Sequence, residues 1–201
     1  MFHKITKLAG LVSLPILRCG IYGKKMENLK TRKTPRFKDF DYNTAGAYFI
    51  TVCTQNRRLL LSRIVGTGVL DCPRTELTEY GAIADKYIKQ LDAFYDNLSI
   101  EGYVIMPNHI HLILWVKEPF HTTSNGQSRT PVPTNVKRAN NPCSQFISTF
   151  KRFCNKEYGE NIWQARFNDH IIRDHKEYEG FLKYIYENPT QWLFDELYSE
   201  V

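Results

Sequence analysis

Apolar and polar residues alternate along the chain with two periods, and these periods predict seven secondary-structure elements. Strands are predicted where β-branched and aromatic residues cluster or alternate with polar ones: 45–54, 100–106, 109–116 and 166–172. Helices are predicted where apolar residues recur at three-and-four spacing: 77–95, 144–158 and 176–188. Asp174 and Glu177 form a capping box at the start of the last helix, and Pro189 ends that helix.

The order of these elements is strand, helix, strand, strand, helix, strand, helix. Only Pro107 and Asn108 interrupt the two middle strands, so these strands read as a hairpin and argue against a purely parallel sheet. The pattern therefore predicts an α+β sandwich, with an antiparallel or mixed sheet and helices mainly on one face.

Basic residues are concentrated near the N-terminus, which changes the meaning of the net charge of +6. Residues 1–38 hold ten Lys and Arg and one acidic residue. Residues 39–201 hold seventeen Lys and Arg and twenty acidic residues. We expect a flexible basic leader at 1–38, with Met26 as an alternative translation start, and a single domain at 39–198. Because the leader carries the excess charge, whole-chain basicity is weak support for a nucleic-acid partner.

A segment rich in Pro, Ser, Thr and Asn interrupts the domain at 119–142 and predicts a loop insertion. The apolar run at 8–17 is shorter than the ~20 residues that a membrane span requires. Arg18 follows this run where a signal peptide needs small residues. None of the five cysteines forms a Cys-x-x-Cys pair, which argues against a zinc knuckle or a redox dithiol. We expect a cytoplasmic protein without a membrane segment.

Two histidines lie on the predicted strand at 109–116. His109 and His111 alternate with apolar residues, so both imidazoles point to the same face while the apolar side chains point to the core. Two neutral imidazoles side by side can bind one divalent metal ion. Two polar residues on a solvated sheet face are the alternative, but Ile113 and Trp115 continue the same face and argue against free solvation.

The last predicted helix carries Tyr184 and Asn188, which share a face because they are four residues apart. That face flanks the apolar stripe of the helix, whereas Tyr186 lies on the opposite flank. Tyr184 and Asn188 can therefore reach a site at the sheet together, and Tyr186 cannot. A packing role with a hydrogen-bonded hydroxyl is the alternative for Tyr184.

The chain resembles the single-tyrosine HUH transposases in three motifs that occur in the same order: MPNHIHL (106–112), IWQARFNDHIIR (162–173) and KYIYENP (183–189). The second and third motifs are most similar to the branch of the REP-associated tyrosine transposases. The segments YNTAGAYFITVCTQNRR (42–58) and LTEYGAI (77–83) also resemble that family, so the resemblance covers nearly all of the predicted domain. It implies a ferredoxin-like HUH endonuclease sandwich.

The resemblance also implies a transposase that cleaves and rejoins single-stranded or hairpin DNA with a tyrosine nucleophile. Carried over by position, Tyr184 is the nucleophile, and His109, His111 and Asn188 are the ligands of a divalent metal ion, Mg²⁺ or Mn²⁺. The implied product is a 5′-phosphotyrosine link with a free 3′-hydroxyl, which keeps the bond energy available for strand transfer. The active site is built within a monomer or between the subunits of a homodimer.

Basic residues without a nearby acid are the expected contacts to the DNA backbone. Between residues 119 and 156 the chain holds six Lys and Arg and no acid. The candidate DNA-binding residues are Arg57, Arg58, Arg63, Lys137, Arg138, Lys151, Arg152, Lys156, Arg166 and His170. A solvated surface is the alternative for each of them, and for Arg166 and His170 a structural role is favoured.

Three other functions stay open from the sequence. A nicking enzyme of the replication-initiator type would use the same chemistry. A domesticated protein would bind a DNA hairpin without cutting it. A structural zinc module is disfavoured by the lack of cysteine ligands. Covalent attachment of DNA to the protein separates the transposase and the nicking enzyme from the other two functions.

Overall fold

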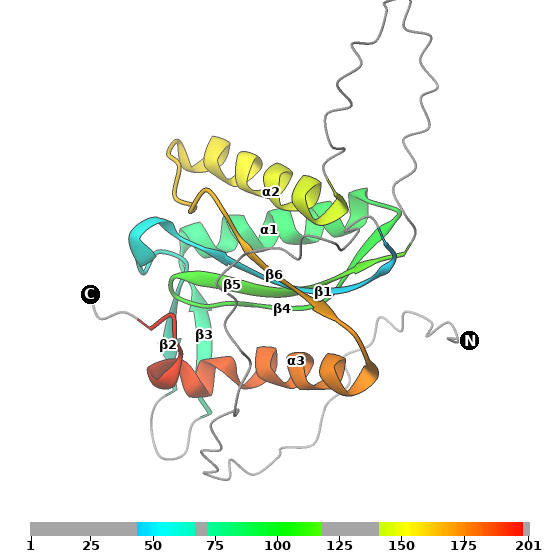
Figure 1. Cartoon of the computed structure of the whole chain (residues 1–201). Helices are drawn as coiled ribbons and strands as arrows, with labels where there is room; N and C mark the ends of the chain where they lie inside the picture. Colours follow the sequence, from blue (N-terminus) through cyan, green and yellow to red (C-terminus); the bar gives the residue numbers. More distant parts are fainter. Residues whose placement is uncertain (1–43, 67–71, 118–140, 199–201) are drawn as a thin grey trace, which may run out of the picture. The chain divides into compact units, whose positions relative to one another are not determined.

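Four antiparallel strands form the sheet on which the rest of the described chain is built (Figure 1). The computed structural model describes residues 44–66, 72–117 and 141–198. Within these ranges the strands follow the order β4-β5-β1-β6 and have the following bounds: β1 Gly46–Cys53, β4 Leu98–Ile105, β5 His109–Val116 and β6 Asn168–Ile172. The expected leader at 1–38, Met26, Lys137, Arg138 and most of the 119–142 insertion lie outside the described residues.

Three α-helices cover the two faces of the sheet: α1 Glu79–Phe94, α2 Pro142–Tyr158 and α3 His175–Glu187. The order β1, α1, β4, β5, α2, β6 is the β-α-β-β-α-β order of the ferredoxin-like fold. The predicted α+β class is therefore confirmed. Figure 1 shows α1 and α2 on one face and α3 on the other, so two of the three helices share a face.

Alternation along the strands explains this arrangement of helices. On β5, the side chains of Ile110 and Leu112 join the apolar cluster under α1 and α2. The side chain of Ile113 points the other way and joins Phe49, Phe181 and others in the cluster under α3. Since both faces of the sheet are apolar, each must be covered to exclude water. The histidines of β5 lie on the face that α3 covers.

Side-chain caps begin the helices close to the predicted positions. The carboxylate of Asp174 accepts a hydrogen bond from the Glu177 backbone N–H over 2.8 Å, as the capping box predicts. The Glu177 carboxylate instead accepts from the Arg173 backbone N–H over 2.7 Å, one residue before the N-cap. Asn141 caps α2 by accepting from the Ser144 backbone N–H over 2.7 Å.

Four elements were not predicted: two short strands and two 3-10 turns. A short hairpin, β2 Ser62–Val65 and β3 Arg74–Leu77, forms a separate two-stranded sheet. The 3-10 turns η1 Gln55–Arg57 and η2 Asn188–Phe194 follow β1 and α3. Pro189 does end the α-helix, but the chain continues as η2 and stays beside the sheet. No helix in the described ranges has the length and apolar character that a membrane span needs.

Candidate active site

Two imidazoles lie side by side on the face of β5 that α3 covers. The ring centroids of His109 and His111 are 4.4 Å apart, and the two residues are 0% and 4% exposed. Across the sheet, His109 lies opposite Cys53 and His111 lies opposite Thr51 on β1. The predicted placement of both rings on one face is therefore observed, and the face is buried rather than solvated.

Each imidazole is held through its Nδ1 atom. The Asn108 side-chain Nδ2 donates to the Leu197 carbonyl over 2.8 Å, which fixes the orientation of the Asn108 amide. The Oδ1 atom of Asn108 therefore accepts from Nδ1–H of His109 over 2.8 Å, and the lone pair of His109 is on Nε2. For His111, the Thr51 hydroxyl lies 2.9 Å from Nδ1.

Burial keeps both imidazoles neutral. It lowers the pKa of His109 to about 3, with a smaller contribution from the positive charge of Arg57. It also lowers the pKa of His111, and His109 adds to this effect while Asp195 opposes it. Neutral imidazole is the form that binds metal ions.

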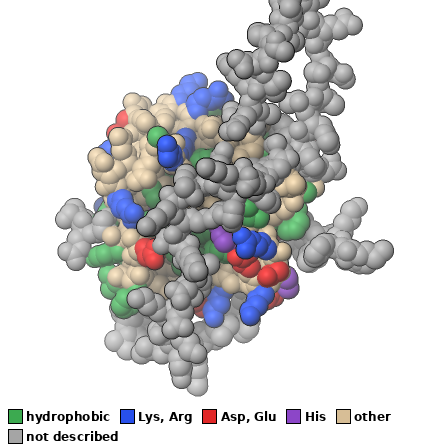
Figure 2. Space-filling view, in the orientation of Figure 1, with side chains coloured by type: hydrophobic (Ala, Val, Ile, Leu, Met, Phe, Trp, Pro, Cys, Tyr) green, Lys and Arg blue, Asp and Glu red, His purple; other side chains and the backbone are tan. Residues whose placement is uncertain are grey.

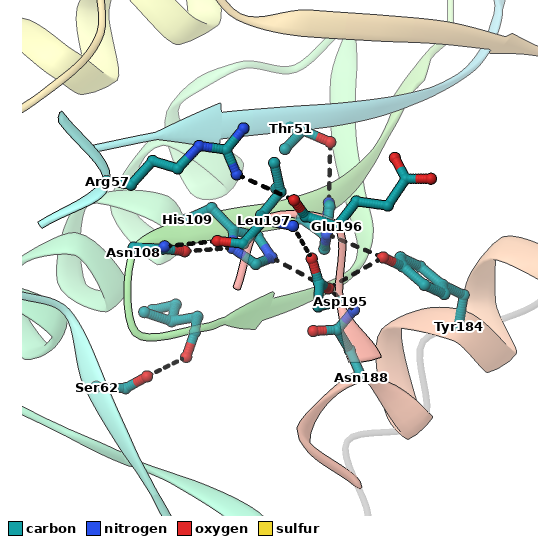
Figure 3. A network of polar contacts seen from close by, with 12 residues as sticks. Thr51, Arg57, Ser62, Asn108, His109, Tyr184, Asn188, Asp195, Glu196 and Leu197 are labelled. Atoms are coloured by element: carbon teal, nitrogen blue, oxygen red, sulfur yellow. Dashed lines mark hydrogen bonds and ion pairs between the residues drawn. The ribbon is translucent and has the colours of Figure 1, made fainter. Parts of the chain in front are cut away.

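Tyr184 extends from α3 toward Asp195 (Figure 3), and its ring centroid lies 5.2 Å from that of His111. Its hydroxyl lies 3.5 Å from Nε2 of His111 and donates to Oδ2 of Asp195 over 3.3 Å. Burial raises the pKa of the Tyr184 phenol, and the negative charge of Asp195 raises it further. Tyr186 is 70% exposed. The predicted difference between the two tyrosines is therefore observed.

Asn188 and Asp195 approach the histidines from the end of α3 and from η2. The Asn188 side-chain Nδ2 donates to Oδ2 of Asp195 over 3.1 Å. Its Oδ1 atom is buried and has no hydrogen-bond partner among the described residues. Asp195 is held by its other oxygen, which accepts from the Leu197 backbone N–H over 2.7 Å.

These side chains together form a possible metal site. His109, His111 and Asp195 each present one ligand atom, and these atoms lie within 4.8 Å of one another. The buried Nε2 of His109 has no hydrogen-bond partner among the described residues and lies 3.9 Å from Oδ2 of Asp195. A lone pair buried without a donor is costly, and a cation between these atoms would satisfy it. The donor set of two imidazoles and a carboxylate therefore fits a divalent metal ion.

Asp195 was not predicted from the sequence. It lies beyond Pro189, where no period marks an element. The signal that was available is an acid between aromatic residues that pack inward: Trp192 contacts the His109 ring and Tyr198 contacts Trp192.

The predicted DNA-binding residues do not form one cluster with the histidines. Arg57 is near them, because its Nη1 donates to the Glu196 carbonyl over 3.4 Å and its charge reaches His109. Arg58 forms an ion pair with Glu160 over 3.3 Å. Other predicted residues are exposed on β2, on α2 or before β6: Arg63, Arg152, Lys156 and Arg166.

Two of the predicted residues are engaged in contacts within the fold. The Nε2 atom of His170 lies 2.6 Å from the Glu177 carboxylate, which links β6 to the first turn of α3. Lys151 donates from Nζ to the Gln164 and Arg166 carbonyls over 2.7 and 3.1 Å.

Comparison with known proteins finds that the chain is similar to REP-associated tyrosine transposases. The chain is 27% identical over 170 residues to the REP-associated tyrosine transposase of Escherichia coli, covering 80% of the chain and 81% of that protein. It is 28% identical over 179 residues to an uncharacterised protein of Haemophilus influenzae, covering 84% of the chain and 94% of that protein. No protein-family model matches the chain.

A solved structure supports the same assignment of fold. It is a REP-associated tyrosine transposase bound to a REP hairpin, with a TM-score of 0.50, 24% identity, and coverage of 73% of this chain and 68% of that one. The likeness shows a shared fold. The chain resembles the REP-associated tyrosine transposases in sequence, as its three motifs indicate, and shares its fold with one of them.

Proposed function

We propose that the chain is a metal-dependent transposase that cleaves single-stranded DNA beside a hairpin with Tyr184 as the nucleophile. One observation carries the proposal: the Tyr184 hydroxyl lies within hydrogen-bond distance of both Nε2 of His111 and Oδ2 of Asp195. The relative that is bound to a REP hairpin supports a DNA hairpin as the substrate.

The reaction is a transesterification that these side chains can arrange. The Tyr184 oxygen attacks the scissile phosphorus, the bond from phosphorus to the 3′ oxygen breaks, and the product is a 5′-phosphotyrosine with a free 3′-hydroxyl. As the bond to phosphorus forms, the phenol gives up its proton to solvent, and the leaving 3′ oxygen takes up a proton from water to become the 3′-hydroxyl. Burial and the charge of Asp195 raise the pKa of the phenol, so near neutral pH this proton loss would need the positive charge of a bound metal ion.

His109, His111 and Asp195 would hold the metal ion, with the unpartnered Oδ1 of Asn188 as a further ligand. Bound Mg²⁺ or Mn²⁺ would polarise the scissile phosphate and favour the phenolate. The neutral histidines are ready to bind because Asn108 and Thr51 hold their Nδ1 atoms. All of these groups come from one chain, so we propose that a monomer carries a complete site.

Covalent capture tests the proposal. Labelled single-stranded DNA that contains a hairpin is incubated with Mg²⁺ or Mn²⁺, and the protein–DNA adduct is detected on a denaturing gel. We expect Tyr184→Phe to abolish the adduct while DNA binding is kept. Tyr186→Phe is the matched control, because it removes an exposed hydroxyl from the same helix. An adduct with Tyr184→Phe would refute this nucleophile, and binding without any adduct in the unmodified chain would favour a domesticated DNA-binding protein.

A further inference from the structure

A second polar site lies between α2 and the segment at 161–165. An open pocket of about 390 Å³ is lined there by two cations, an indole and three amides: Lys151, Arg152, Trp163, Asn155, Asn161 and Gln164. None of the described residues that line this pocket is acidic. Figure 2 shows Lys and Arg side chains over the region of α2. The pocket therefore favours an anion or a strong hydrogen-bond acceptor.

Trp163 contributes a donor that the fold leaves unused. The residue is 2% exposed, and its ring packs against Phe150 with centroids 5.3 Å apart. The Nε1–H group is buried and has no hydrogen-bond partner among the described residues. An unsatisfied buried donor costs roughly 1–3 kcal/mol, so such a group calls for a partner. Trp163 lines the pocket, so an acceptor bound there would supply this partner after a small shift of the indole ring.

Lys151 is held in a fixed position at the same pocket. Its ammonium donates to two backbone carbonyls, those of Gln164 and Arg166, and has a third N–H. Burial lowers the pKa of Lys151 to about 8, so the ammonium is still largely charged at neutral pH. Arg152, the next residue on α2, is exposed and adds a guanidinium group. A pre-positioned ammonium beside a guanidinium suits a phosphate group.

The pocket lies close to the proposed active site along β1. The Gln164 backbone N–H donates to the Cys53 carbonyl over 2.9 Å, and Thr54 pairs with Trp163. Cys53 in turn lies opposite His109 on β5. The backbones of Gln164 and His109 are therefore about two strand spacings apart, or roughly 10 Å. A single DNA strand that leaves the histidines past the end of β1 can reach the pocket.

We propose that this pocket binds a backbone phosphate of the DNA substrate, with Lys151, Arg152 and the Trp163 Nε1–H as donors. The proposal rests on the proposed function, because it takes the DNA of that reaction as the ligand. It assigns a role in substrate binding to residues of α2. This helix covers the face of the sheet opposite to α3, which carries the nucleophile. The same chemistry would also bind free inorganic phosphate, so the experiment separates the two sources.

Binding of a labelled hairpin DNA is measured by anisotropy in EDTA as the salt concentration is varied. We expect Arg152→Gln to lower the affinity and to reduce the slope of log K against log[salt] by about 0.7, the value for one lost phosphate contact on a single strand. Trp163→Phe should lower the affinity about two- to tenfold without changing the slope, because it removes a neutral donor. Lys176→Gln is the control, since this exposed cation on α3 does not line the pocket.

A direct readout identifies the ligand. The chain has three tryptophans, and Trp163→Phe assigns the Nε1–H resonance of Trp163 in a ¹⁵N-labelled sample. We expect DNA to shift this resonance and inorganic phosphate at equal ionic strength to leave it unchanged. A shift with phosphate alone would overturn the DNA assignment. The pocket itself would be excluded if Arg152→Gln kept the original salt slope or if Lys176→Gln had the same effect.

These outcomes are separable from those of the proposed function. If Tyr184 were not a nucleophile, the unmodified chain would form no adduct but the binding differences would persist. If the pocket did not bind DNA, adduct formation would be intact and the binding differences would vanish.

Discussion

The Tyr184 hydroxyl donates a hydrogen bond to Oδ2 of Asp195 over 3.3 Å, so the phenol and a buried carboxylate act as one unit. The same oxygen of Asp195 accepts from Asn188 and lies 3.9 Å from Nε2 of His109. A single carboxylate therefore connects the candidate nucleophile with the candidate metal ligands. Its position on the turn after α3 makes that turn part of the site.

Replacing Asp195 tests this connection. We expect Asp195→Asn to weaken Mn²⁺ binding at least about tenfold, because a charged ligand is lost, and to lower the pKa of Tyr184, because the adjacent negative charge is removed. Calorimetric titration with Mn²⁺ and the pH-dependent absorbance of the phenol measure the two effects. Glu196→Gln is the control, since it removes the neighbouring exposed acid. Unchanged Mn²⁺ affinity in Asp195→Asn would exclude Asp195 as a ligand.

The hydrogen bond of Thr51 orients a candidate ligand without touching the metal. Thr51→Val keeps the shape of the side chain on β1 but removes the hydroxyl that lies 2.9 Å from Nδ1 of His111. We expect Mn²⁺ affinity to fall about 10- to 100-fold while the thermal midpoint in EDTA changes little. Equal loss of affinity and of folded structure would instead indicate a purely structural role.

The buried histidines make folding stability depend on pH. The pKa of His109 is about 3 in the folded chain against 6.5 for the free side chain, so the unfolded state binds the proton first as the pH falls. Stability is therefore complete above about pH 6.5 and is lost toward pH 3. Between pH 7 and 5 we expect His109 to account for about 2 kcal/mol.

Urea unfolding in EDTA at the two pH values measures this dependence. His109→Asn should remove most of the difference between them, whereas the exposed control His175→Gln should not. A pH dependence that persists in His109→Asn would show that other groups cause it.

Gly81 and Gly180 form a matched pair of helical glycines. A Cβ on Gly81 would lie 1.9 Å from the Leu61 carbonyl oxygen, so we expect Gly81→Ala to destabilise the chain by at least about 2 kcal/mol. A Cβ on Gly180 meets no atom within 4 Å, so Gly180→Ala should stabilise it by about 0.5–1 kcal/mol. Chemical unfolding of the two variants checks both signs, and equal effects would show that α1 can move away from Leu61.

The elements that pack against the two faces of the sheet were predictable from the sequence. The strand at His109–Val116 has the predicted bounds, and no end of α1, α2 or α3 differs from its predicted position by more than two residues. These segments bury one apolar face, and burial gives them the period that identifies them. The same periods place Tyr184 on one helix face with Asn188, one turn away, and His109 on one strand face with His111, two residues away. These parts of the site were therefore predictable as well.

The rest depends on contacts between segments far apart in the sequence. The four-residue strands β2 and β3 are too short for a period to stand out. Asp195 reaches the histidines only because η2 continues past Pro189 and packs beside the sheet through Trp192. No local pattern encodes that path. The use of Asn108 to hold His109 is likewise visible only with Leu197 in place.

The two-residue turn between β4 and β5 sets a strict limit on how this chain can change length. Met106 and His109 pair across Pro107 and Asn108, through the Met106 N–H and the His109 carbonyl 2.9 Å away. A residue added there must be taken up by a longer loop or a bulge, because a shift of the pairing by one would turn every side chain of β5 to the opposite face. Both imidazoles would then enter the apolar layer under α1 and α2. A change of length at this turn is therefore compatible with the site only where the pairing of β4 with β5 is kept.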